Sequence, residues 1–141
     1  MTMKKVVIDH NIVYSALRAK DSQTRRKLLA TTSVQFFTPN YLIVELFKHR
    51  PRIVANSDAS ESEILSFVSK VFQKIHFFNE ELISIPNFIE AYHLCKEIDE
   101  DDTAYIALSL EIDAEFWTRD DVLKKGLKLK GFDNFFDENE L

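Results

Sequence analysis

Short apolar runs that suit β-strands alternate with longer segments of helical periodicity, and this alternation is what most limits the possible folds of the chain. The first run is Val6, Val7 and Ile8, all β-branched, and a helical apolar pattern follows it at 12–30. Further strands are expected at 33–39, 76–78 and 114–118. Strands separated by helices predict an α/β fold in which a mainly parallel, twisted central sheet carries helices on both faces.

Capping residues and prolines set the expected helix boundaries between these strands. Asn40 is a candidate N-cap for a helix that ends before Pro51. Several capping residues precede a single apolar stripe, which predicts an amphipathic helix over 57–75. The remaining helices are expected at 87–98, 101–112 and 120–132.

The length and composition indicate an ordinary globular protein. The chain has 141 residues, the usual size of one domain, so we expect a single domain over 1–141. Cys95 is the only cysteine, which excludes an internal disulfide framework, and no apolar run approaches the roughly 20 residues that span a bilayer. We therefore expect a cytoplasmic protein without a membrane partner. The net charge of −5 disfavours a uniformly basic protein that coats nucleic acid but permits a local basic patch.

Three aspartates occupy positions that the predicted topology brings together. Asp9 follows the first strand, Asp120 follows the last strand, and Asp102 lies at the start of a helix. Ligands of open parallel sheets bind beyond the carboxyl ends of the strands. We therefore expect the three carboxylates to meet in one crevice.

Glu45 is a fourth candidate, because it lies one turn into the helix after the second strand among apolar neighbours. Carboxylates gathered in a crevice repel one another and are costly to desolvate, so protons or a cation must compensate them. Oxygen ligands without a histidine or cysteine cluster favour Mg²⁺ or Mn²⁺ over zinc.

Three stretches carry these acids in a pattern that is similar to a known family. They are "VVIDHNIVYSAL", "YLIVELFKH" and "DDTAYIALSLEIDAEFWTRD". In the third, an acid stands five residues before the alanine of "ALSL", and the strand ends in Thr118, Arg119 and Asp120. Over essentially its whole length the chain resembles a PIN domain, the nuclease fold of VapC-type toxins. His10 departs from the pattern, which usually has threonine or serine there, and "IDEDD" is similar to a PIN subgroup outside the best-studied toxins.

The resemblance implies a metal-dependent endoribonuclease that hydrolyses RNA phosphodiester bonds with Mg²⁺ or Mn²⁺, as the toxin of a type II toxin–antitoxin pair. It implies the catalytic acids Asp9, Glu45, Asp102 and Asp120, with Asp9, Asp102 and Asp120 as metal ligands and Asn11 and Thr118 as supporting residues. It also implies an antitoxin protein that obstructs the metal site, and a homodimer. RNA processing without an antitoxin stays open.

Simpler roles remain open for the same side chains. Asp9 and Asp120 could cap helices. Asp102 could be a first-turn acid that interacts favourably with the helix dipole, and Glu45 could lie on an exposed helix face. Other carboxylates lie close by in the sequence, so the position of the third acid is open by about one helical turn. These rival residues are Asp99, Asp101 and Asp121.

Basic and aromatic side chains offer further candidates. Residues that could contact the RNA backbone are Lys48, Arg50, Arg52, Arg119, Lys124 and Lys125, with an ordinary solvated face as the alternative. The four histidines have no spacing typical of a zinc site, so structural or surface roles are expected. Cys95 and the three Phe-Phe pairs are expected in core or subunit contacts.

Other function classes fit the residues less well. A phosphatase of the haloacid dehalogenase type needs an aspartate two positions after Asp9, where this chain has Asn11. A nucleotide-binding domain needs a glycine-rich loop, and the two glycines, Gly126 and Gly131, build none. A receiver domain needs an aspartate after its third strand, and "HFFN" supplies none. The main rival is a non-catalytic PIN-like module that binds RNA or a protein.

Overall fold

The computed structural model describes residues 3–18 and 22–141, and its described part contains a four-stranded sheet of order β3-β2-β1-β4. The strands are β1 (Lys4–Ile8), β2 (Val34–Pro39), β3 (Ile75–Phe78) and β4 (Glu115–Trp117). All three strand pairings are parallel, for example Val6 beside Phe36 and Ile8 beside Trp117. The predicted α/β fold with a parallel sheet is confirmed, and all four strands lie where the apolar runs placed them.

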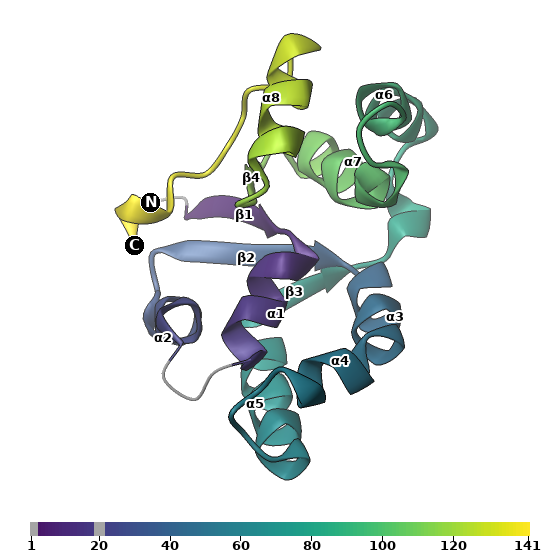
Figure 1. Ribbon diagram of the computed structural model, residues 1–141. Helices are drawn as coiled ribbons and strands as arrows, with labels where there is room; N and C mark the ends of the chain where they lie inside the picture. The colour runs from purple at the N-terminus through teal and green to yellow at the C-terminus, as the bar shows by residue number, and fades with distance from the viewer. Residues whose placement is uncertain (1–2, 19–21) are drawn as a thin grey trace.

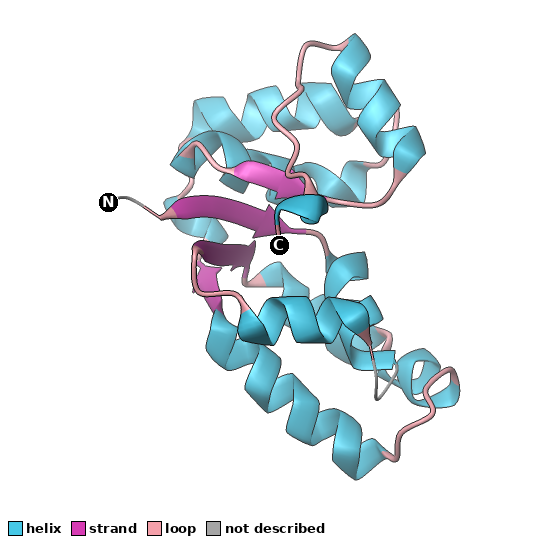
Figure 2. Ribbon diagram, turned by 90° about the vertical axis from the view of Figure 1, so that its left-hand side faces the viewer, coloured by secondary structure: helices cyan, strands magenta, loops and turns pink. Residues whose placement is uncertain are grey.

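Helices cover both faces of this sheet, as Figures 1 and 2 show. One group contains α1 (His10–Arg18), α2 (Gln23–Ala30), α3 (Tyr41–Lys48), α4 (Arg50–Ala55) and α5 (Glu61–Lys74). The other contains α6 (Ile85–Cys95), α7 (Thr103–Ile112) and α8 (Asp121–Leu129). Two apolar cores result, because successive strand residues point to opposite faces: Val6 and Ile8 join the first core and Val7 joins the second.

The strand order places a topological switch beside β1. The chain runs from β1 to β2 and β3 on one side and later returns to place β4 on the other side. The carboxyl ends of β1 and β4 are joined where the Asp9 N–H donates to the carbonyl of Trp117 at 3.1 Å. Open α/β sheets bind ligands at such a point.

One helix prediction was wrong, and one helix was not expected. The helix expected over 12–30 is divided into α1 and α2. Ser22 has an extended backbone, and its side chain caps α2 by accepting from the N–H of Arg25. Residues 19–21 of that prediction lie outside the described residues. The helix expected to end before Pro51 does so, because α3 ends at Lys48. The unexpected helix is α4, which begins at Arg50 with Pro51 in its first turn, where proline needs no hydrogen-bond partner.

Asn40 is at the N-cap position of α3, but its side chain makes no capping hydrogen bond. The carboxylate of Glu80 instead accepts from the N–H of Tyr41 at 2.6 Å. Ser60 and Glu63 form a complete capping box at the start of α5, as its capping residues predicted.

Cys95 is fully buried in the second core, and the pair Phe36 and Phe37 divides between the two cores, as expected. In the described part of the chain, no helix combines the length and apolar character that crossing a membrane requires.

Candidate active site

Asp9 is fixed at the carboxyl end of β1 by contacts on both carboxylate oxygens. Its Oδ1 accepts from the backbone N–H of Asn11 at 2.8 Å, and its Oδ2 accepts from the hydroxyl of Thr118 at 2.7 Å. Asp9 and Thr118 are both buried. The first contact is what a helix-capping role predicts, whereas the second joins Asp9 to the end of β4. Capping alone therefore does not account for the environment of Asp9.

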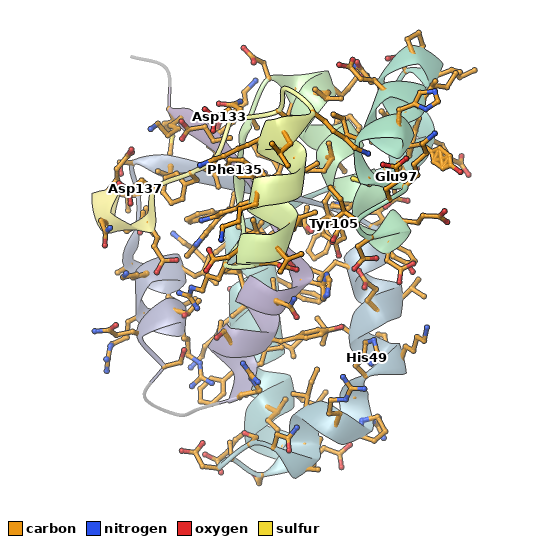
Figure 3. The ribbon with its side chains drawn as sticks, turned by 45° about the horizontal axis from the view of Figure 1, so that its top comes forward. His49, Glu97, Tyr105, Asp133, Phe135 and Asp137 are labelled. Atoms are coloured by element: carbon orange, nitrogen blue, oxygen red, sulfur yellow. The ribbon has the colours of Figure 1, made fainter. Side chains whose placement is uncertain are left out.

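Glu45 is buried on α3 and accepts a hydrogen bond from the hydroxyl of Tyr105 at 2.5 Å. Tyr105 extends from α7 toward α3 and connects the two helix groups (Figure 3). Burial raises the pKa of Glu45, whereas the bond from Tyr105 and the nearby His10 lower it. The exposed-face interpretation of Glu45 was wrong, because the side chain points into the protein.

His10 lies between the first two acids. Its Nδ1 is 3.3 Å from Asp9 Oδ1 and 3.7 Å from Glu45 Oε2, and its ring is close to that of Tyr105 at 5.8 Å between centroids. The side chain is partly exposed, so it lies at one edge of the region around these carboxylates, which we call the acidic region. From the sequence, His10 was expected to have a structural or surface role like the other histidines, and its contact with two acids was not predicted.

Asp102 is buried at the N-cap position of α7, yet its side chain caps nothing. Its Oδ1 is buried and has no hydrogen-bond partner among the described residues. Burial raises the pKa of Asp102 to about 8, with further increases from the charges of Asp9, Asp99, Asp120 and Glu45. Asp9, Glu45 and Asp120 are therefore close enough to Asp102 for their charges to act on it.

Asp120 has the capping contact that the simpler role predicts. It is exposed, and its Oδ1 accepts from the N–H of Leu123 at 3.1 Å at the start of α8. Its own N–H donates to the Thr118 hydroxyl at 3.2 Å, so Thr118 lies between Asp120 and Asp9. Asp120 thus combines a cap with a place at the edge of the acidic region.

The rival acids are arranged differently from Asp102. Asp99 accepts from the N–H of Asp101 at 3.0 Å and thereby caps the short 3₁₀ turn at Glu100–Asp102. Asp99, Asp101 and Asp121 are exposed, whereas Asp102 is buried. The geometry favours Asp102 as the third acid.

Asn11 supports Asp9 through its backbone rather than through the amide that the resemblance suggests, since the contact to Asp9 comes from its N–H. The Asn11 side chain is exposed. Thr118 is the closer match to its expected role, because its hydroxyl contacts a carboxylate directly.

The basic candidates fall into two groups. Arg50 pairs with Glu61 at 3.4 Å and Arg119 pairs with Glu138 at 2.9 Å, so carboxylates already engage both. Arg52 and Lys124 line two separate cavities, and Lys48 and Lys125 are exposed.

A metal ion fits part of this site. Among residues 3–18 and 22–141, no group of three or more His, Cys, Asp or Glu side chains is arranged to hold a metal ion. Mg²⁺, however, is commonly bound by one or two carboxylates, with water and substrate phosphates as its other ligands. The unpartnered Asp102 Oδ1 and the remaining lone pairs of Asp9 suit such an ion.

Sequence reasoning missed the roles of His10 and Tyr105. Tyr105 is three residues after Asp102 at the start of α7, so the two side chains share a helix face, and this spacing was a usable signal. His10 directly follows Asp9 in the sequence, and this position could have indicated that it lies near the site.

A family model described as PIN domain matches residues 7–138, a range that includes Asp9, Glu45, Asp102 and Asp120. A search of curated proteins gave no match.

Proposed function

The chain belongs to the PIN domain family, whose members are generally nucleases, and we propose that it is a metal-dependent endoribonuclease that hydrolyses RNA phosphodiester bonds. The observation that carries the proposal is Asp102, a buried carboxylate with an unpartnered oxygen in the field of other acids. Such an arrangement destabilises a fold unless a proton or a cation compensates the charge. In this proposal the 141 residues form one PIN domain.

Asp9 and Asp102 would hold a divalent cation, Mg²⁺ or Mn²⁺, which when bound stabilises charge on a phosphodiester and lowers the pKa of water. Asp120 would complete the ligand set from the edge of the site. Thr118 and the Asn11 N–H keep both Asp9 oxygens in place. Tyr105 fixes Oε1 of Glu45, which leaves Oε2 on the side of His10 to accept a proton.

Family resemblance supports a narrower role. The nuclease would be the toxin of a type II toxin–antitoxin pair that acts as a homodimer on cytoplasmic RNA, and a small antitoxin would cover the acidic site. Co-expression with the neighbouring open reading frame, followed by purification of the tagged nuclease, tests this role. A stable complex that suppresses cleavage is expected, whereas an active nuclease that no neighbouring product inhibits would indicate an RNA-processing enzyme.

The proposed activity is tested by incubating purified protein with a mixed cellular RNA pool in Mg²⁺, Mn²⁺ or EDTA. Fragments are expected with either metal and not with EDTA. The variants Asp9→Asn and Asp102→Asn should produce none, because each keeps the side-chain shape and removes one charge. A folded wild-type protein that binds RNA but cleaves it with neither metal would overturn the proposal in favour of a non-catalytic module.

A further inference from the structure

A cavity of about 170 Å³ lies between α1 and the α3–α4 segment, next to the acidic region. It is lined by His10, Asn11, Tyr14, Arg18, His49, Arg52, Ile53 and Asn56. Pockets for drug-sized ligands measure about 300–1,000 Å³, so this cavity suits one small planar group. His10 belongs both to the cavity and to the acidic region, so a group bound here would be adjacent to the proposed reaction centre.

Three rings form one side of the cavity. The ring of Tyr14 lies 5.4 Å from that of His10 and 5.9 Å from that of His49, measured between centroids, and both contacts are edge-to-face. Figure 3 labels His49 where α3 meets α4. Aromatic and histidine rings are surfaces on which unpaired bases of RNA stack. The cavity therefore has the ring chemistry that a nucleobase requires.

The cavity also has a buried polar group for which the described residues provide no partner, as well as exposed amides. The Tyr14 hydroxyl is buried and has no hydrogen-bond partner within the described part of the chain. Burial raises the pKa of Tyr14, so the hydroxyl keeps its proton near neutral pH and remains a donor. A buried donor without an acceptor is costly, and an acceptor on a bound group would remove that cost. The amides of Asn11 and Asn56 add both donors and acceptors.

Two arginines provide positive charge at the same place. Arg18 and Arg52 are exposed residues that line the cavity, and neither forms an ion pair with the residues that the structure describes. Arg50, two positions before Arg52, is instead paired with Glu61. Free guanidinium groups are suited to binding phosphate.

We propose that this cavity is a base-binding subsite for single-stranded RNA. One unstacked base enters it and contacts the rings of His10, Tyr14 and His49, while Arg18 and Arg52 contact the flanking phosphates. The inference rests on the proposed function and specifies its substrate, since a base held in a duplex cannot enter. The bond next to this base is then the one presented to Asp9 and Asp102.

The test measures binding of fluorescently labelled single-stranded RNA of about eight nucleotides to the Asp102→Asn protein, in which cleavage does not interfere. A series of oligonucleotides carries one abasic nucleotide at each position in turn. We expect one position at which loss of the base weakens binding about 5- to 100-fold. The His49→Ala variant should bind the intact RNA more weakly and should lose sensitivity to that abasic position.

Matched variants separate this site from general effects. His93→Ala removes an exposed histidine of α6 and should bind like its parent. Arg52→Ala should weaken binding and reduce its salt dependence, whereas Arg26→Ala on α2 should not. Tyr14→Phe keeps the ring and removes only the hydroxyl, so it provides a second variant if His49→Ala does not fold.

Two results would overturn the inference: no abasic position matters, or His49→Ala retains the sensitivity of its parent. If wild-type protein still cleaves RNA in that case, the nuclease proposal stands without the subsite. If the abasic pattern is found but wild-type protein cleaves nothing, the subsite belongs to a non-catalytic RNA-binding module.

Discussion

Thr118 donates a hydrogen bond to Asp9 across 109 positions of sequence and thereby joins the ends of β4 and β1 at the switch point of the sheet. The same hydroxyl accepts from the N–H of Asp120. Replacing Thr118 with valine keeps the shape, removes both contacts, and should lower the free energy of unfolding by about 1–3 kcal/mol. RNA cleavage should fall as Asp9 loses its fixed position.

Urea unfolding and cleavage rates check this prediction, with Thr118→Ser as the variant that restores the hydroxyl and Thr32→Val as an exposed control. If Thr118→Val is as stable and active as the wild type, the bond to Asp9 has no measurable role.

Tyr105→Phe removes the hydrogen bond that lowers the pKa of buried Glu45. The pKa of Glu45 should then rise further, because burial raises it and the opposing hydrogen bond is gone. A raised folded-state pKa makes stability fall as pH increases above the unfolded value, so the loss should be larger at pH 8 than at pH 5. We expect about 1–3 kcal/mol at the higher pH.

Urea unfolding at the two pH values measures the difference, and Tyr92→Phe on α6 is the exposed control. An equal loss at both pH values would mean that Tyr105 acts through packing and not through the Glu45 carboxylate.

Asp102 should make the metal-free protein less stable as pH rises. Its pKa is raised from 3.8 to about 8, so between these values the folded protein binds a proton that the unfolded chain has released. The free energy of unfolding should therefore fall through this range, by at most about 1.4 kcal/mol per pH unit. Asp102→Asn should flatten the dependence and be more stable than wild type near pH 8 in EDTA.

Unfolding curves from pH 5 to pH 8 in EDTA provide the measurement, with Asp101→Asn as the exposed control. A wild-type curve as flat as that of Asp102→Asn would show that the Asp102 carboxyl is not protonated by folding.

Cys95 should react slowly with thiol reagents in the folded protein. The side chain is fully buried, and burial together with the charges of Asp102 and Asp99 raises the pKa of the thiol to about 12. Thiolate is the reactive form, so labelling at pH 8 should be slow until urea unfolds the chain. If Cys95 is labelled as fast in the folded protein as in the unfolded protein, its buried position is contradicted.

The parts of the fold that follow from local pattern were predictable. Four apolar runs gave the four strands, and their order with helices between them placed Asp9 and Asp120 at neighbouring strand ends. Boundaries inside helical regions were less predictable: Ser22 is compatible with a helix interior by pattern, but its capping bond begins α2. The pattern correctly predicts that a helix ends before Pro51, but it does not reveal α4, in which proline occupies the first turn.

The acids of the site could be predicted from the sequence, but the side chains that contact them could not. Glu45 was identified by its apolar neighbours, but its bond to Tyr105 spans 60 positions and depends on where the fold places α7 relative to α3. The same holds for the cavity, because His10 and His49 meet around Tyr14 only after α1 packs against the α3–α4 segment.

The most direct test of the account is the single-turnover rate at which wild type, Asp102→Asn and Asp121→Asn cleave a labelled single-stranded RNA in Mg²⁺. Asp121 is an exposed acid next to the site and is the matched control for loss of one charge. We expect Asp102→Asn to cleave at least about 100-fold more slowly than wild type, while Asp121→Asn stays close to wild type. Cleavage by folded Asp102→Asn at the wild-type rate would contradict it.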